Sequence, residues 1–100
     1  RLVGDPEREV RTVAVLGGSG RSYMRRAISA KADVFVTGDI DHHTAHDALA
    51  AGLAIADVGH HAEKIMKRGV AEGLQNKLKA LQYSTRVVPS AIDTDPFRFV

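Results

Sequence analysis

Thr12-Val13-Ala14-Val15-Leu16, followed at once by Gly17-Gly18-Ser19-Gly20, is the stretch that decides the fold. The apolar run is rich in β-branched residues and predicts a buried strand, and the glycine-rich tetrapeptide predicts the turn that ends it. Apolar residues then recur at helical spacing from Ser22 to about Ala30. The stretch therefore predicts a strand–turn–helix unit.

The same alternation continues along the chain. The predicted elements are strands over residues 33–37, 53–58 and 85–88 and helices over residues 44–51 and 61–81. Alternation of this kind predicts an α/β fold in which a mostly parallel sheet, joined by right-handed crossovers, is covered by helices. At this length, residues 1–100 are expected to form a single α/β domain.

The long helix predicted for residues 61–81 carries a clear amphipathic pattern. Its apolar stripe consists of Ile65, Met66, Val70, Leu74, Leu78 and Leu81. Gly69 and Gly73 fall inside this helix, where each costs about 1 kcal/mol relative to alanine. We therefore expect a kink or a close helix contact at these glycines.

Composition limits the possible partners. A net charge of +2, without aromatic residues among the basic ones, argues against a nucleic-acid partner. The absence of cysteine excludes disulfides and cysteine zinc sites and fits a reducing compartment, so we expect the cytoplasm. No apolar stretch approaches the roughly 20 residues that span a bilayer, so no membrane partner is expected.

Polar residues follow three of the predicted strands, in the loops of residues 17–20, 37–43 and 57–63. The carboxyl ends of parallel strands meet at one edge of a sheet, where ligands bind. We therefore expect the three loops to converge. All five histidines lie in two of these loops or in the helix starts after them: His42, His43, His46, His60 and His61.

These histidines and the neighbouring carboxylates are residue types that bind metal ions. His60 and Glu63 are three residues apart at a helix start, so both can face one ion, and His42 and His46, four apart, could do the same. The alternative is that the histidines are simply exposed or cap helix ends. The pattern alone leaves these two interpretations about even.

Asp39 and the glycine-rich turn each have two interpretations. Asp39 is either a general base or carboxylate that holds a histidine, or the N-cap of the next helix. The turn of residues 17–20 either cradles an anion on its backbone N–H groups or is a tight turn with close helix packing. No catalytic residue is identified, since Ser19 lies in no nucleophile-elbow motif.

Three stretches together carry a family resemblance. They are Val13-Ala14-Val15-Leu16-Gly17-Gly18-Ser19-Gly20, Ala32-Asp33-Val34-Phe35-Val36-Thr37-Gly38-Asp39-Ile40 with His43, and Asp57-Val58-Gly59-His60-His61-Ala62-Glu63. Their order and spacing resemble the C-terminal half of the Nif-three-like family, whose bacterial members are often labelled GTP cyclohydrolase 1 type 2 homologs. We therefore expect the C-terminal segment of a longer, two-halved bacterial protein. One departure is Lys31, where the family usually has glycine.

The resemblance implies a Nif-three-like half-domain with a dinuclear metal centre in a cleft between two halves, usually in a toroidal homohexamer. The family's metal ligands map to His60 and Glu63, and Asp39 and His43 match positions near the cleft that would orient ligands or relay protons. The implied cofactor is a divalent metal, zinc or another first-row ion such as Mn or Fe, with two ions per full-length protomer.

Two functions are compatible with such a centre. The first is a metal-dependent hydrolase acting on nucleotide or phosphoester substrates. The alternative is a non-enzymatic metal-carrying or oligomerising interaction scaffold.

Overall fold

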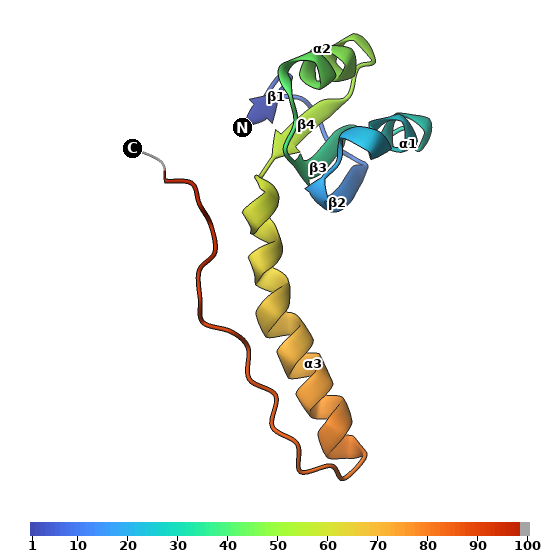
Figure 1. The fold of residues 1–100 in the computed structure, drawn as a ribbon. Helices are drawn as coiled ribbons and strands as arrows, with labels where there is room; N and C mark the ends of the chain where they lie inside the picture. Colours follow the sequence, from blue (N-terminus) through green and yellow to red (C-terminus); the bar gives the residue numbers. More distant parts are fainter. Residues whose placement is uncertain (99–100) are drawn as a thin grey trace. The chain divides into compact units, whose positions relative to one another are not determined.

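The computed structural model describes residues 1–98. The chain divides into two compact units, Arg1–Ala62 and Glu63–Val100, and each is described by itself (Figure 1). The expectation that residues 1–100 form a single domain stays a prediction.

A four-stranded sheet with the order β1-β4-β3-β2 forms the first unit. Its strands are β1 (Leu2–Val3), β2 (Val13–Ser19), β3 (Val34–Gly38) and β4 (Ala54–Asp57). β3 pairs in parallel with both β2 and β4, whereas β1 pairs antiparallel with β4. The predicted α/β fold with a mostly parallel sheet is confirmed. β1 was not predicted, because two residues are too few to show a period.

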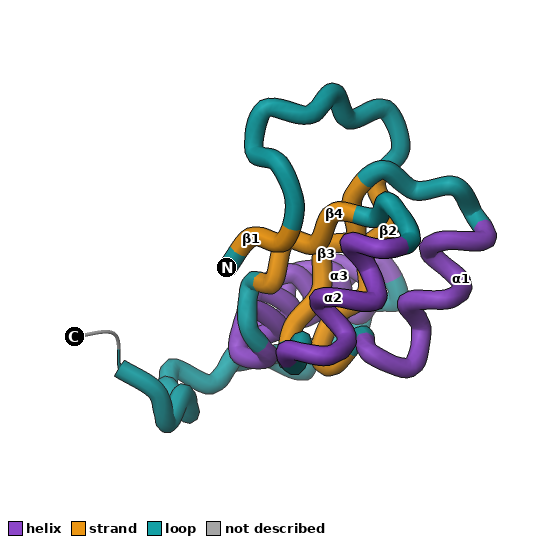
Figure 2. The backbone as a smooth tube through the Cα atoms, turned by 90° about the horizontal axis from the view of Figure 1, so that it is seen from above, coloured by secondary structure: helices purple, strands orange, loops and turns teal. Residues whose placement is uncertain are grey.

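Helices cover one face of this sheet (Figure 2). η1 (Arg21–Tyr23) runs into α1 (Met24–Ser29) between β2 and β3, and α2 (His42–Ala50) joins β3 to β4. Ala27 of α1 and Ala48 of α2 are buried in one core with Phe35 and Ile55, which are register partners in the sheet. Because β2, β3 and β4 advance across the sheet in one direction, right-handed crossovers place both helices on the same face.

β2 extends further than the sequence predicted. It continues through the glycines to Ser19, and its register with β3 shifts between Val15 and Ser19. Gly18 has φ of +68°, a conformation that suits glycine and is typical of a bulged strand end. A Cβ on Gly20 would collide with the side chain of Thr37, so close packing accounts for that glycine.

The end of α1 places Lys31 in a backbone conformation that favours glycine. Lys31 has φ of +55°, its N–H donates to the Ile28 carbonyl at 2.9 Å, and the Ala32 N–H donates to the Ala27 carbonyl at 3.1 Å. This pair of bonds is a Schellman motif, in which a left-handed residue follows the helix end. Lysine takes that conformation here at a cost that glycine would avoid.

The second unit is built on one long helix. η2 (His60–Ile65), which begins in the first unit, leads into α3 (Met66–Ala80), so the helix predicted for residues 61–81 is confirmed with a 3₁₀ start. A Cβ on Gly69 or Gly73 would meet nothing within 4 Å, so among the described residues the close contact expected there is absent. No helix in the described part of the chain is both long and apolar enough to cross a membrane.

The chain after α3 runs extended beside that helix (Figure 1). The strand predicted for residues 85–88 is wrong: within residues 1–98 this stretch joins no sheet. Gln75 bonds it instead, because its Nε2 donates to the Thr85 carbonyl at 3.2 Å and its Oε1 accepts from the Val87 N–H at 2.8 Å. The β-branched residues favour an extended backbone, but this backbone makes hydrogen bonds with the Gln75 side chain of α3 and not with a neighbouring strand.

Candidate functional site

The loops after β2, β3 and β4 meet at one edge of the sheet in the first unit. The Gly20 N–H donates to the Gly38 carbonyl at 3.3 Å, and the Val58 N–H donates to the Thr37 carbonyl at 2.8 Å. These bonds join the loops after β2 and β4 to the end of β3, and the Ile40 N–H in the loop after β3 donates to the carboxylate at the end of β4. The predicted convergence of the three loops is therefore confirmed.

Asp57, the last residue of β4, ties two of these loops together. Its carboxylate is buried and accepts the Ile40 N–H at 3.0 Å and the Gly59 N–H at 2.9 Å. The guanidinium of Arg1 also contacts it. Burial raises the pKa of the Asp57 carboxyl, but the N–H groups of Gly59 and Ile40 together with Arg1 outweigh burial and hold that pKa below its usual value. A charged Asp57 therefore fixes the loop before α2 against the loop after β4.

Asp57 had no predicted role of its own. Its only sequence signal is an acidic residue at the end of an apolar run, where a buried charge needs partners. Both backbone donors are known only from the tertiary structure.

Gly38 allows β3 to approach the loop after β4 closely. A Cβ on Gly38 would lie 2.7 Å from the Gly59 carbonyl carbon and 2.8 Å from the His60 nitrogen. The next residue, Asp39, has φ of +57°, in the left-handed region that residues other than glycine rarely adopt. Close approach and an unusual backbone therefore coincide where Asp39 meets His60.

Asp39 and His60 form a carboxylate–histidine pair. Asp39 Oδ2 lies 2.6 Å from His60 Nδ1, and the two side chains are 47% and 61% exposed. A carboxylate on one ring nitrogen fixes the orientation and tautomer of the imidazole, which is the usual arrangement for a histidine that binds metal through its other nitrogen. The N-cap interpretation of Asp39 is wrong, because Asp41 caps α2 by accepting the Thr44 N–H at 3.0 Å.

The other two predicted site residues, Glu63 and His43, lie on helices. Glu63 is in η2, three residues after His60, and belongs to the second unit. His43 is exposed on α2, with its ring centroid 5.7 Å from that of His42. Within residues 1–98, no three His, Asp or Glu side chains form a group that could hold a metal ion. The assignment of His60 and Glu63 as metal ligands stays a prediction.

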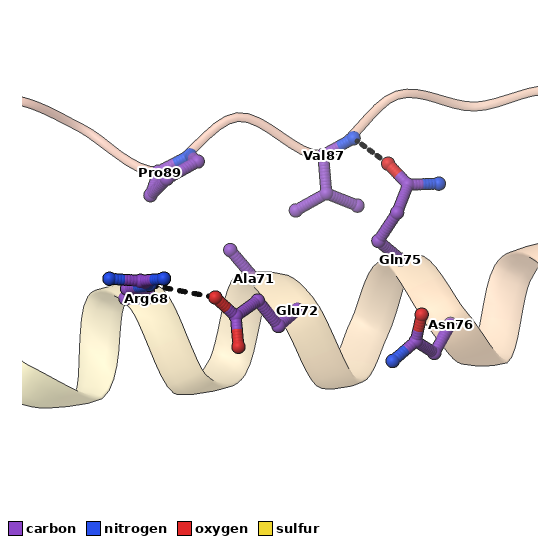
Figure 3. Close-up of a pocket in the computed structure, with 7 residues that line it drawn as sticks. All are labelled: Arg68, Ala71, Glu72, Gln75, Asn76, Val87 and Pro89. Atoms are coloured by element: carbon purple, nitrogen blue, oxygen red, sulfur yellow. Dashed lines mark hydrogen bonds and ion pairs between the residues drawn. The ribbon is translucent and has the colours of Figure 1, made fainter.

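A groove of about 500 Å³ lies within the second unit, between α3 and the extended chain that follows it (Figure 3). It is lined by Arg68, Ala71, Glu72, Gln75, Asn76, Val87 and Pro89. Figure 3 shows the Arg68–Glu72 ion pair and the bond from Val87 to Gln75 beside it. None of the predicted site residues lines this groove.

Known proteins resemble the whole chain. A family model described as Duf34/NIF3 (NGG1p interacting factor 3) matches residues 1–96. Proteins named GTP cyclohydrolase 1 type 2 homolog from Halalkalibacterium halodurans and Bacillus subtilis are 54% and 46% identical over 100 residues, which are all of this chain and 27% of each relative. The crystal structure of a Bacillus cereus protein related to NIF3 superposes with a TM-score of 0.92 at 49% identity, covering 100% of this chain and 28% of that one.

These matches confirm the resemblance inferred from the three motifs. They also show that the chain spans about a quarter of the length of the relatives it matches. The match over residues 1–96, which includes the mostly parallel sheet and the converging loops, establishes that this chain belongs to the Duf34/NIF3 family.

Proposed function

We propose that this chain contributes part of a dinuclear metal centre, with His60 and Glu63 as metal ligands. The observation that carries the proposal is the 2.6 Å contact between Asp39 Oδ2 and His60 Nδ1. Histidines that bind metal almost always pass their other ring N–H to a carboxylate, a backbone carbonyl or water. The donor set, imidazole with carboxylate, suits zinc, manganese or iron.

The surrounding residues have supporting roles in this proposal. Asp39 orients the imidazole of His60 and increases its strength as a ligand. Asp57 and Gly38 fix the loops that carry this pair. Glu63 would add a carboxylate oxygen, and His43 would orient ligands or relay protons. The remaining ligands would come from the rest of the full-length protein.

The full-length protein is proposed to be a metal-dependent hydrolase that acts on nucleotide or phosphoester substrates. When bound, two divalent ions would activate water and polarise a phosphoester or a ring carbon–nitrogen bond. The relatives' name, GTP cyclohydrolase 1 type 2 homolog, supports the nucleotide class. By the same resemblance, we propose a cytoplasmic homohexamer.

The test is metal analysis of the intact protein and three variants. His60→Ala should lose most of the bound first-row metal, because a ligand is removed. Asp39→Asn should weaken metal affinity about 10- to 100-fold, the usual effect of removing a partner of a ligating histidine. His61→Ala, the adjacent histidine, is the matched control and should keep its metal. A wild-type protein without first-row metal, or a His60→Ala variant with unchanged content, would contradict the proposal.

A non-enzymatic interaction scaffold is the second candidate. The observation that favours it is the apolar stripe of η2 and α3, where Ile65 is 81% exposed and Val70 is 56% exposed. Exposed apolar surface of this kind marks interaction sites. A protein that binds metal but turns over no phosphoester or nucleotide in a broad screen would favour the scaffold over the hydrolase.

A further inference from the structure

α2 carries a second group of histidines, of which His42 and His46 have no role in the metal centre proposed above. His42, His43 and His46 are all exposed on this helix. The ring centroids of His42 and His46 are 4.5 Å apart, with an interplanar angle of 73°. Residues four apart lie on one face of a helix, so the helix itself brings these two imidazoles together.

Within the described part of the chain, His42 and His46 have no role in packing or capping α2. The buried positions of α2 are Thr44 and Ala48, and the cap is Asp41, whose carboxylate accepts bonds from the Thr44 N–H at 3.0 Å and from the Thr44 hydroxyl at 2.8 Å. Packing and capping are therefore carried out by other residues. The cap also fixes the first turn of the helix, from which His42 projects.

We propose that His42 and His46 form a chelating site for a divalent transition-metal ion, separate from the centre proposed at His60. Two histidines at this spacing on one helix face are the arrangement that zinc metalloproteases use for two of their ligands. Because both imidazoles project from one helix face, one nitrogen of each ring can bind a common ion, with water completing the coordination. The ring centroid of His43 lies 5.7 Å from that of His42, but residues one apart do not face each other on a helix, so the site is assigned to His42 and His46.

The donor set defines the class of ion. Two imidazole nitrogens favour Cu²⁺ most strongly, followed by Ni²⁺ and Co²⁺, and Mg²⁺ and Ca²⁺ prefer oxygen ligands. A site with two protein ligands binds more weakly than a closed four-ligand site. We therefore expect rapid, reversible binding of one ion.

The test separates this site from the centre at His60. Calorimetric titration with Cu²⁺ is carried out on the intact protein carrying His60→Ala, which removes one ligand of the centre proposed above. One Cu²⁺ per chain should still bind at α2, and Ni²⁺ should bind more weakly. Adding His46→Ala should lower the Cu²⁺ affinity at least about tenfold, since even residues that only support a metal ligand act on this scale.

His43→Ala in the same background is the matched control, because it removes an exposed imidazole from the same helix. It should leave the Cu²⁺ affinity within about threefold, given that adjacent residues face different sides. Unchanged affinity after His46→Ala would overturn the proposal, as would an equal loss after His43→Ala. Thermal unfolding without metal checks that each variant folds. A loss of first-row metal caused by His60→Ala alone tests the centre at His60 and says nothing about the site on α2.

Discussion

Gly38 in the first unit and Gly73 in the second both lie inside regular secondary structure, but a side chain would meet opposite surroundings at the two positions. At Gly38 a Cβ would lie 2.7 Å from the backbone of Gly59, whereas at Gly73 it would meet nothing within 4 Å. The first unit therefore uses glycine to bring two loops into contact at its candidate site. In the second unit the glycine only loosens a helix. Glycine is therefore required for close packing at position 38, whereas at position 73 the described residues leave room for a side chain.

Gly38→Ala is the strongest test of this comparison. The added methyl group collides with backbone, which cannot rotate away as a side chain can, so we expect a loss of about 2–3 kcal/mol in the free energy of unfolding. The displaced loop carries His60, so metal affinity should fall as well. Urea unfolding followed by circular dichroism measures the first effect. Wild-type stability would show that the loops can separate freely.

Asp57→Asn tests whether the contact between the loops also depends on a charge. An asparagine amide points N–H at a backbone donor, so one of the bonds from Ile40 or Gly59 is lost, at a cost of about 1.5–3 kcal/mol. Asp47→Asn, an exposed position on α2, is the matched control and should change stability by less than about 0.5 kcal/mol.

The same variant has a signature in pH dependence. Because the folded pKa of Asp57 lies below its unfolded value, its contribution to stability is fully present above about pH 4. That contribution is lost as the pH falls further, through the folded pKa. Asp57→Asn should therefore show a shallower loss of stability than wild type below about pH 4. Identical acid unfolding curves for the two proteins would show that ionisation of Asp57 does not contribute to the loss of stability at low pH.

Lys31→Gly reverses the comparison, because here the first unit lacks a glycine where its backbone would favour one. Removing the side chain at φ of +55° should stabilise the protein by about 1 kcal/mol. Lys31→Ala keeps the Cβ and serves as the control, with little gain expected. Equal melting temperatures for the glycine and alanine variants would contradict the backbone explanation.

Gly73→Ala should have the smallest effect, in the opposite direction from Gly38→Ala. With open space around it, alanine should stabilise α3 by about 0.5–1 kcal/mol through helix propensity. The change in unfolding free energy can be compared directly with that of Gly69→Ala, which should behave in the same way. A destabilised Gly73→Ala variant would reveal a partner packed against this face of α3.

The regular elements of the first unit were largely predictable. The strand expected at residues 33–37 is β3 (Val34–Gly38), and the one expected at residues 53–58 is β4 (Ala54–Asp57). Both are apolar runs bounded by polar or glycine-rich turns, a signal that neighbouring residues alone produce. Residues 85–88 have similar composition, but a strand also needs a sheet edge beside it, which composition does not supply.

The amino-acid sequence alone is enough to predict the alternation of strands and helices, the family, and the meeting of three loops at one edge of a mostly parallel sheet. Each of these depends on residues close together in the chain or on a general rule of parallel topology. The folded structure was needed to show that Asp39 contacts His60, that Asp57 accepts bonds from the Ile40 and Gly59 N–H groups, and that Gly38 leaves no room for a side chain. Apart from the bond between Asp57 and the nearby Gly59 N–H, these contacts join residues 17 to 21 positions apart, so they depend on strand register and loop geometry, which no local pattern encodes.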